Sequence, residues 1–565
     1  MRGIQTPRPV SEQSEVFMKR IKELVVTAFC VLLYVLGYVA NQNAYTAGPA
    51  ETTAQTVEQA AGYDHTSRDD DCRTTYEIFV SSFCDSDGDR IGDLNGIRGK
   101  LDYISDLGFD QIWLTPVHPS DTYHKYDVDD YLAIDPTFGT MGDYEALLEE
   151  CHARGIRVLM DLVLNHTSDT HPWFQAAVDY LRTLPDGQEP VFEDCPYVWY
   201  YTFSREPYQG FVPLEGTQWY YEARFWSEMP DLNLGNEVVR REIRDIVRYW
   251  LDKGVDGFRL DAVTSYVTDS PEGNIEFMRF LEDTCRGIDP DCYLVGEAWT
   301  DDSSIARLYA SGIDSLFDFP FAGPNGVIGS VMKGSSAASE YVQAMVRTEA
   351  AYDEANPSHV GAPFYTNHDM DRSASYYPSD TGAVTKMTYA MSLLMPGDSF
   401  VYYGEEIGMG GSGRDENRRA PMYWSEDAAA TGMCAAPSGM EEVPMRFASL
   451  EGQMTDDGSL WSWFKEVIRV RKAFPAIAQG KTEAEGSLCD EGVAAFIRRH
   501  EGDDDVLVVM NLRNQPATKD LSSVSDGLRL AAALSTGGED VTLEQDRLSL
   551  PAYSIAVLTF GADSL

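Results

Sequence analysis

The chain has 565 residues, of which 43% are hydrophobic and 24% are charged, a composition typical of a globular protein and not of a disordered or collagen-like one. Its 44 Lys and Arg against 91 Asp and Glu give a formal net charge of −47. This charge argues against a nucleic acid partner, because phosphate binding needs clustered cations.

The first 71 residues differ from the rest of the chain. Leu24–Ala40 is an uncharged run of 17 residues that follows Lys19, Arg20 and Lys22, a pattern typical of a signal peptide or a single membrane anchor. We assign residues 1–45 to this segment and residues 46–71, which lack apolar periodicity, to a solvated linker. Either form of the segment would export the remaining chain, so an extracellular or cell-surface location is expected.

The nine cysteines include no C-x-x-C pair, which argues against a metal site built on sulfur. With Cys30 inside the N-terminal segment, eight cysteines remain, an even number compatible with disulfides in an oxidising compartment. Cys285 and Cys292 are the candidate local pair.

From Cys72 onward, short apolar runs alternate with helical stretches such as Glu237–Leu251, and this alternation indicates parallel strands joined by crossovers. Eight such runs over about 400 residues predict a closed (β/α)8 TIM barrel, built from residues 72–168 and 237–478. The runs are Tyr76–Val80, Gln111–Val117, Val158–Asn165, Gly257–Val263, Tyr293–Trp299, Ser315–Phe321, Pro363–His368 and Phe400–Gly404.

Two regions fall outside this alternation. Residues 169–236, after the third strand, are rich in aromatics and too long for a structureless loop, so they predict an inserted subdomain. Residues 479–565 contain strand-like runs with little helix and predict a C-terminal β-sandwich domain. Trp219, Tyr220, Tyr221 and Trp226 in the insertion would serve either as sugar-stacking surfaces or as the core of the insertion.

Polar residues accumulate at the carboxyl ends of four predicted strands, and in a barrel these ends converge on one mouth. A single Asp there would be a helix cap or a loop anchor, but this many are hard to explain as caps. The set is Asp161, Asn165, His166, Arg259, Asp261, Glu297, His368 and Asp369.

Paired carboxylates at such a mouth suit the cleavage of a glycosidic bond with retention, in which one carboxylate attacks the sugar and a protonated carboxylic acid serves the leaving group. Asp261 lies two residues from Arg259 on one strand face, and the cation would keep it ionised as the nucleophile. Glu297, flanked by Gly296, Ala298 and Trp299 with no neighbouring cation in the sequence, suits a raised pKa and the role of acid.

These segments carry a resemblance. Asp161–His166, Gly257–Asp261, Gly296–Trp299 and Phe364–Asp369 resemble the four signature regions of the alpha-amylase family of glycoside hydrolases, in the family's order. Met229–Asn233 is similar to a further signature, in the form of members intermediate between oligo-1,6-glucosidases and neopullulanases. The resemblance covers about residues 74–475.

The resemblance implies a role for each matching residue. Asp261 would be the nucleophile, Glu297 the acid/base, and Asp369 a third carboxylate that holds substrate hydroxyls. His166 and His368 would bind the sugar at the cleavage subsite, and Arg259 would orient Asp261.

Other positions bear on linkage. His124 and Tyr126 have the alpha-amylase spacing, with Tyr126 as stacking platform, and Ala262 resembles the α-1,4-acting members, since the 1,6-acting ones usually carry Val there. Thr264 and Ser265 depart from many alpha-amylases, which place a Lys-His pair on the leaving-group side. Both that contact and the central calcium ligand supplied by the His are therefore not expected here.

A different metal site is expected after the first strand. Asp85, Asp87, Asp89 and Asp93 occupy loop positions 1, 3, 5 and 9, with the backbone carbonyl of Ile91 at position 7. Such oxygen ligands suit Ca²⁺, and alpha-amylase relatives bind calcium in a loop like this one. The alternative is an acidic turn in an acidic protein.

The main hypothesis is an exported, monomeric alpha-amylase-type hydrolase acting on α-1,4 bonds of starch-like α-glucans or maltooligosaccharides. An oligosaccharide-directed α-glucosidase or transglycosidase is the alternative within the enzyme class. A non-catalytic amylase-like ectodomain on a membrane anchor is a third, and the intact set Asp261, Glu297 and Asp369 argues against it.

Overall fold

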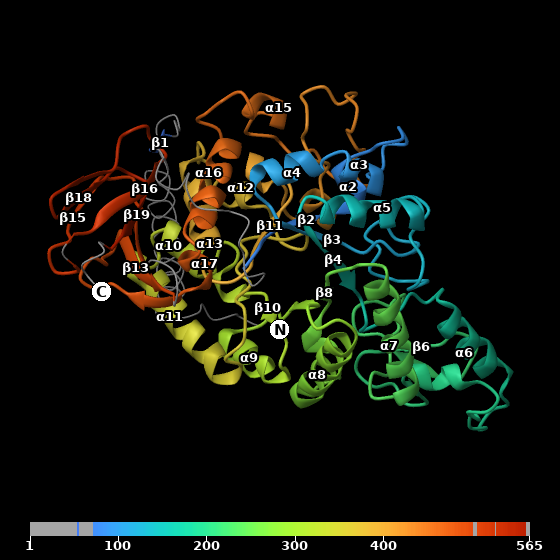
Figure 1. Ribbon diagram of the computed structural model, residues 1–565. Helices are drawn as coiled ribbons and strands as arrows, with labels where there is room; N and C mark the ends of the chain where they lie inside the picture. The colour runs from blue at the N-terminus through green and yellow to red at the C-terminus, as the bar shows by residue number, and fades with distance from the viewer. Residues whose placement is uncertain (1–52, 56–71, 501–504, 526, 561–565) are drawn as a thin grey trace, which may run out of the picture.

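The computed structural model describes residues 53–55, 72–500, 505–525 and 527–560 (Figure 1). The predicted signal peptide or anchor therefore lies outside the described residues. Within the described part of the chain, no helix combines the length and the apolar character needed to cross a membrane.

A parallel sheet curls into a barrel at the centre of the molecule, as predicted (Figure 1). The chain pairs its strands in the order β10, β9, β8, β4, β3, β2, β11. The seventh predicted segment forms single parallel bridges, Ala362 with Phe317 and Phe364 with Phe400, which connect the two edges of the sheet. The strands are β2 (Thr74–Ile78), β3 (Gln111–Leu114), β4 (Arg157–Leu162), β8 (Gly257–Leu260), β9 (Tyr293–Gly296), β10 (Ser315–Leu316) and β11 (Ser399–Tyr402).

Alternation of side chains along these strands gives the barrel two apolar layers. Leu159, Val295 and Phe400 belong to a cluster inside the barrel, whereas their neighbours Val158 and Leu294 belong to the cluster shared with the surrounding helices. Both faces of each strand are thus buried, which explains why the sequence shows continuous apolar runs.

Helices cover the outside of the barrel (Figure 1). The predicted helix is α7 (Glu237–Asp252); the Asn236 side chain caps it by accepting from the Val238 N–H. The Trp250 indole on its inner face donates to the Tyr131 carbonyl, 2.8 Å away. The other α-helices of the barrel region are α2 (Val80–Phe83), α3 (Leu94–Arg98), α4 (Leu101–Leu107), α5 (Met141–His152), α8 (Pro271–Ile288), α9 (Asp302–Leu308), α10 (Val327–Met332), α11 (Ala338–Ala355), α12 (Ser373–Tyr376), α13 (Ala383–Leu393), α14 (Asp415–Arg418), α15 (Leu450–Gln453), α16 (Leu460–Ala473) and α17 (Ala476–Gln479).

The chain between β4 and α7 forms a small unit at the end of the molecule away from the C-terminal sheets (Figure 1). Trp219 and Tyr221 are buried in this unit, and the Tyr221 ring packs edge-on against Phe174. These two aromatics are therefore core residues and cannot stack on sugar, whereas Trp226 is 44% exposed. The elements are α6 (Pro172–Thr183), the 3-10 helix η2 (Pro196–Tyr200), β5 (Phe203–Ser204), β6 (Phe211–Pro213) and β7 (Tyr220–Glu222).

The C-terminal region packs a six-stranded antiparallel sheet against a three-stranded one. Leu507, Val509 and Leu558 of the first sheet contact Leu548 and Leu550 of the second, which makes this region a β-sandwich. Thr53–Gln55, within the expected linker, forms β1 and pairs with β16 at the sheet edge. The strands are β12 (Lys481–Ala484), β13 (Val493–Arg499), β14 (Val506–Asn511), β15 (Ala517–Asp520), β16 (Arg529–Ser535), β17 (Thr542–Glu544), β18 (Arg547–Leu550) and β19 (Ser554–Thr559).

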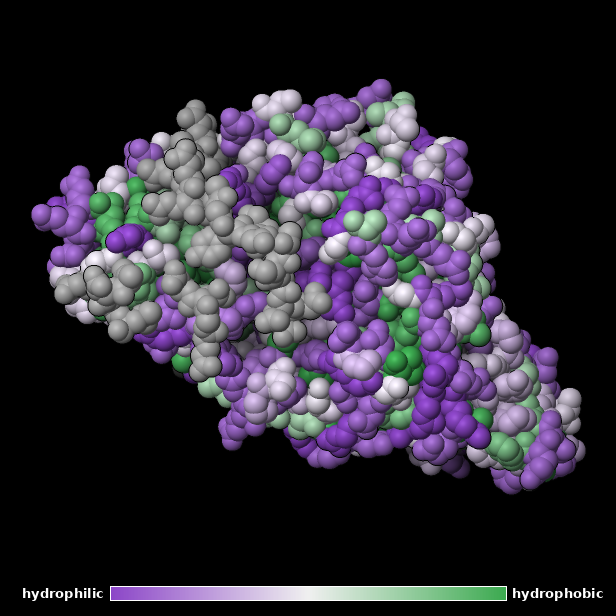
Figure 2. All heavy atoms as spheres, in the orientation of Figure 1, coloured by the Kyte–Doolittle hydropathy of each residue, from purple (hydrophilic) through white to green (hydrophobic). Residues whose placement is uncertain are grey.

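Neither Cys285 nor Cys292 forms a disulfide in the structure, so the candidate local pair is not joined. Both thiols are buried, Cys285 at the end of α8 and Cys292 just before β9. The face shown in Figure 2 is largely hydrophilic.

Candidate active site

The carboxyl ends of β4, β8 and β9 bring three carboxylates to one guanidinium. The Nη1 atom of Arg259 lies 2.9 Å from Asp161 Oδ1 and 2.7 Å from Asp261 Oδ1, and its Nη2 atom lies 2.9 Å from Glu297 Oε2. Arg259 is fully buried. Because the arginine contacts Asp261 through Oδ1, the other oxygen, Oδ2, is the one left to act as a nucleophile.

Two contacts of Glu297, one hydrogen bond and one ion pair, meet at the same oxygen. The Ala262 N–H donates to Oε2 over 3.0 Å, and Arg259 Nη2 lies against that oxygen as well. The proton of a neutral Glu297 therefore resides on Oε1. Ala262 achieves this contact in a left-handed backbone conformation, with φ 47°, which is unusual for a residue with a side chain.

The expectation that Glu297 has no neighbouring cation is wrong, because Arg259 reaches it from the adjacent strand. Burial nevertheless raises the pKa of Glu297 to about 7, opposed by Arg259 and reinforced by the charge of Asp261. The raised pKa thus has a cause that the flanking residues could not show, namely the loss of solvent at the mouth of the barrel.

Asp369 lies after the seventh barrel segment and is held by two cations. Its Oδ1 is 2.7 Å from Arg419 Nη2 and its Oδ2 is 3.1 Å from His368 Nε2. Although burial raises the pKa of Asp369, the His368 charge and then Arg419 lower it well below its ordinary range. Asp369 is therefore an ionised acceptor, about one third exposed, suited to accept hydrogen bonds from sugar hydroxyls.

Tyr126 contacts each of the other four predicted substrate-binding residues. Tyr126 and His368 stack on each other, with ring centroids 5.4 Å apart and planes 5° apart. His124 is hydrogen-bonded to Thr122 and to the Tyr126 N–H, and burial lowers its pKa to about 4, so it is a neutral ring.

His166 contacts the backbone of Tyr126. Its Nε2 is 3.1 Å from the Tyr126 carbonyl, and burial lowers its pKa. The neighbouring Asn165 donates to Asp231 Oδ1 over 3.1 Å, a structural hydrogen bond.

Two contributors to this site, Glu77 and Arg419, were not predicted, and a third, Asp161, was predicted at the mouth without a role. Asp161 accepts from Tyr126 Oη at 2.9 Å, Glu77 contacts His368, and Arg419 holds Asp369. Asp161 ends a strand, and Glu77 interrupts an apolar strand, so both had a signal in the sequence. Arg419 comes from the loop after α14 and had none.

An exposed aromatic surface adjoins Glu297. Trp299 is 56% exposed, and its ring stacks on Phe319 at 4.9 Å with an interplanar angle of 20°. An exposed, supported indole two residues from the candidate acid is the kind of flat apolar face on which sugar rings pack.

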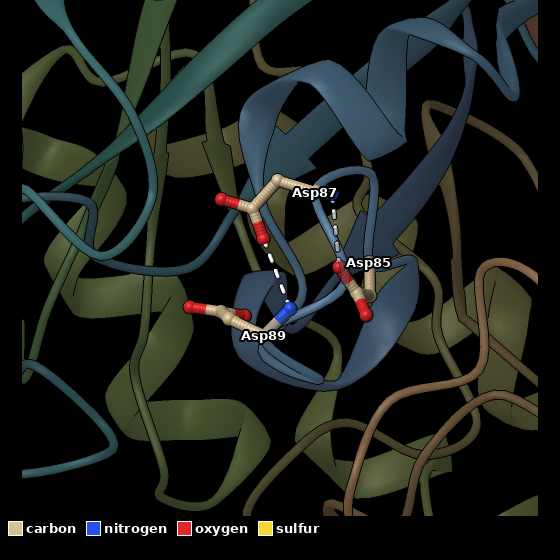
Figure 3. A group of neighbouring side chains, drawn as sticks. All are labelled: Asp85, Asp87 and Asp89. Carbon is tan, nitrogen blue, oxygen red and sulfur yellow. Dashed lines mark hydrogen bonds between the residues drawn. The ribbon is translucent and has the colours of Figure 1, made fainter.

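The predicted metal loop gathers three of its four carboxylates. Asp85, Asp87 and Asp89 each offer an oxygen within 4.8 Å of the others, and Figure 3 shows them around one turn of the loop, linked by hydrogen bonds from the Asp87 and Asp89 N–H groups. The Ile91 N–H donates to Asp89 Oδ1. Asp93 instead caps α3 through the Gly96 N–H and accepts from Ser86.

Comparisons with known proteins agree on the family. The model of the alpha amylase catalytic domain matches residues 77–480. Alpha-amylase 3 of Dictyoglomus thermophilum is 37% identical over 441 residues, which cover 77% of this chain and 84% of that protein. The solved structure of Eubacterium rectale Amy13B superposes with a TM-score of 0.88 at 45% identity and covers 91% of this chain and 100% of its own.

The relatives differ in their named activities. One is a trehalose synthase/amylase of Mycolicibacterium smegmatis, 32% identical over 79% of this chain and 84% of its own length; others are named alpha-glucosidase and oligo-1,6-glucosidase. With the family model spanning most of the chain, this protein belongs to the alpha-amylase family of glycoside hydrolases.

Proposed function

We propose that the protein is a retaining hydrolase of α-1,4-glucosidic bonds in starch-like α-glucans or maltooligosaccharides. The observation that carries this proposal is the placement of Asp261 and Glu297 on adjacent nitrogens of Arg259, with Asp369 held nearby as an ionised acceptor. Close carboxylates of different protonation state are what double displacement at a sugar carbon requires.

The reaction follows from the two carboxylate oxygens that do not contact Arg259, Asp261 Oδ2 and Glu297 Oε1. Asp261 Oδ2 attacks the anomeric carbon while the Oε1 proton of Glu297 passes to the leaving glycosidic oxygen, which gives a glycosyl ester on Asp261 and a shortened glucan. Glu297, now ionised, takes a proton from water, and that water displaces Asp261 from the anomeric carbon. Arg259 contacts both carboxylates, so it stabilises the charge on whichever of them is ionised.

The first expected result concerns the products. Amylose should yield maltooligosaccharides early, in the α-anomeric form, because two displacements retain configuration. Proton NMR of the first products tests the stereochemistry and chromatography tests the chain length. If β-anomeric sugar appears first, double displacement is wrong.

An oligosaccharide-directed α-glucosidase or transglycosidase is the second candidate. Thr264 and Ser265 stand in the 3-10 helix η3 (Val263–Ser265) beside the site, without the Lys-His pair of many alpha-amylases, and several relatives carry glucosidase or trehalose synthase names. Glucose as the sole first product from amylose, trehalose formed from maltose, or faster cleavage of isomaltose than of maltotriose would favour this candidate.

We also propose that the loop from Asp85 to Asp93 binds Ca²⁺. Its donor set is hard oxygen, which fits this cation, and three carboxylates without a cation between them repel one another. The ion would be held by Asp85, Asp87, Asp89 and the Ile91 carbonyl. Asp93 would join them after releasing the N-terminus of α3, which it caps in this structure. The ion would supply charge balance and loop rigidity, away from the carboxylates at the barrel mouth.

Removal of this calcium should lower the melting temperature by several degrees while the chemistry at Asp261 is preserved, because an ion that binds only the native state stabilises it by mass action. Thermal unfolding with and without a chelator measures the effect. Asp87→Ala should melt as the chelated protein does and be insensitive to the chelator. Asp106→Ala, which removes an exposed carboxylate of α4, is the matched control. Identical curves for all samples would contradict the site.

The N-terminal basic and apolar segment supports export, and we propose an extracellular or cell-surface location, with a monomeric enzyme acting on a polymeric neutral substrate. A net charge of −47 keeps such a protein soluble and does not repel a neutral glucan.

A further inference from the structure

Glu77 is a buried carboxylate on an inner strand of the barrel, and the reaction described above leaves it without a role. It lies on β2 and is 1% exposed. Its Oε1 accepts from His368 Nδ1 at 2.6 Å and from the His368 N–H at 3.2 Å. Among the described residues, His368 supplies both hydrogen bonds to this side chain, so the cost of burying the carboxylate is offset by that one residue.

The opposite nitrogen of the His368 ring enters a second chain of contacts. Nε2 lies 2.7 Å from Tyr126 Oη and 3.1 Å from Asp369 Oδ2, and Tyr126 Oη lies 2.9 Å from Asp161 Oδ2. Glu77 and Asp161 are thus joined through a histidine and a phenol; Glu77, Asp161 and His368 are buried and Tyr126 is partly buried.

The number of protons in this chain fixes the charge of His368. A phenol carries one proton, and ionised carboxylates only accept. If Tyr126 donates to Asp161, then Nε2 must donate to Tyr126 or Asp369, and Nδ1 must donate to Glu77. Both ring nitrogens are then protonated. A neutral ring would set a nitrogen lone pair against Glu77 Oε1 at 2.6 Å or against Asp369 Oδ2 at 3.1 Å.

We propose that Glu77 is a positioning residue, which keeps the His368 imidazole doubly protonated so that Nε2 always presents an N–H to Tyr126 and Asp369 at the sugar-binding mouth. The charging of His368 by Glu77 is independent of the proposed glycosidase function, and only the expected effect on turnover rests on that function. The charged ring in turn keeps Asp369 ionised and fixes the plane on which Tyr126 stacks.

The electrostatic surroundings agree with a charged ring. Burial lowers the pKa of His368, but Asp369 and then Glu77 raise it well above its ordinary value. The titratable and charged groups that face His368 come from β2, β4, β8 and three loops, and acidic groups outnumber cations among them. They are Glu77, Asp161, Asp369, Arg259, Arg419, Tyr126 and His124.

A spectroscopic test needs no substrate. An imidazole N–H in a 2.6 Å bond to a carboxylate should give a proton resonance far downfield of the amides, assigned by its loss in His368→Gln. In the full-length protein this resonance should persist from pH 6 to above pH 8, disappear in Glu77→Gln at pH 8, and remain in Glu77→Asp, which keeps the negative charge. Its absence from the unmutated protein, or its persistence in Glu77→Gln, would overturn the proposal.

The loss of the Glu77 charge should also lower turnover. Glu77→Gln should lower kcat on maltotriose about 10- to 100-fold with KM changed less than about threefold, as second-layer partners of an essential group do. Glu297 sets the alkaline limb of the parent profile at about pH 7, and in Glu77→Gln this limb should shift at least one unit towards acid, because His368 then loses its second proton before Glu297 does. A loss of kcat with an unmoved limb would indicate a purely structural role and overturn the proposal.

Glu406→Gln is the matched control. Glu406 is also fully buried and accepts from Tyr76 Oη, next to Glu77 on the same strand, and from Tyr103 Oη, but it does not contact His368. This variant should lose thermal stability, but it should retain the downfield resonance and the alkaline limb of the parent pH profile. If the resonance behaves as expected while even the unmutated protein leaves maltotriose intact, the proposed function fails and the role of Glu77 in charging His368 stands.

Discussion

Asp261→Asn should lower kcat on maltotriose by about 10⁴-fold or more, a loss comparable with removal of the nucleophile in other covalent mechanisms. The amide cannot form the glycosyl ester, whereas its oxygen can still accept from Arg259, 2.7 Å away in the parent protein. The fold should therefore be intact, with an unfolding transition close to that of the unmutated chain. Initial rates from chromatography, together with thermal unfolding, measure both quantities.

Asp398→Asn provides a control for the loss of a buried carboxylate. Asp398 stands immediately before β11, at the barrel end opposite the candidate site, and burial raises its pKa to about 7, so it is partly neutral already. This variant should stay within about twofold of the parent rate. Near-parent hydrolysis by Asp261→Asn, with Asp398→Asn behaving likewise, would remove Asp261 as the nucleophile.

The barrel and the positions at its mouth could be predicted because parallel strands impose them. The strand Gly257–Leu260 is buried along its whole length, and the residue that follows it must face the mouth, so Asp261 could be placed without a structure. The same rule applies to Glu297, which follows β9. The resemblance to a known family then supplied roles for positions that geometry alone had only grouped.

The electrostatics of the site could not be predicted, because they depend on distances between strands. Arg259 is two residues from Asp261 in the chain, but its guanidinium also reaches Glu297 on β9, and no local pattern encodes that contact. Arg419 reaches Asp369 from a loop that is 50 residues further along. The residues next to Glu297 and Asp369 in the chain therefore do not reveal that Arg259 and Arg419 contact these carboxylates.

Aromatic residues posed a different difficulty. Trp219 and Trp226 occur in the same short segment, yet one is 6% and the other 44% exposed. Irregular segments have no helical or strand period from which the buried face could be inferred, so composition alone left core and binding surface as equal alternatives.

Glu297→Gln should lower hydrolysis of maltotriose about 10³-fold, since a poor leaving group needs its proton in the transition state and general acids typically contribute 10²- to 10⁴-fold. An aryl glucoside with a strongly acidic phenol needs no such proton. Its first turnover should therefore proceed within about tenfold of the parent rate and release a burst of phenol. The second step lacks its base, so the glycosyl ester on Asp261 should accumulate, and an added small anionic nucleophile such as azide should release it.

The pH dependence gives an independent check on Glu297. Because burial raises its pKa to about 7, the acid form is present below that pH, and kcat/KM on maltotriose should fall as the pH rises through about 7. In Glu297→Gln the group no longer titrates, so the burst with the aryl glucoside should lose this limb. Asp261→Asn should give no burst with either substrate. The assignment would be wrong if Glu297→Gln slowed both substrates equally and azide restored neither rate. The proton would then have to come from a group other than Glu297, and the contact between Glu297 and Arg259 would be a structural ion pair.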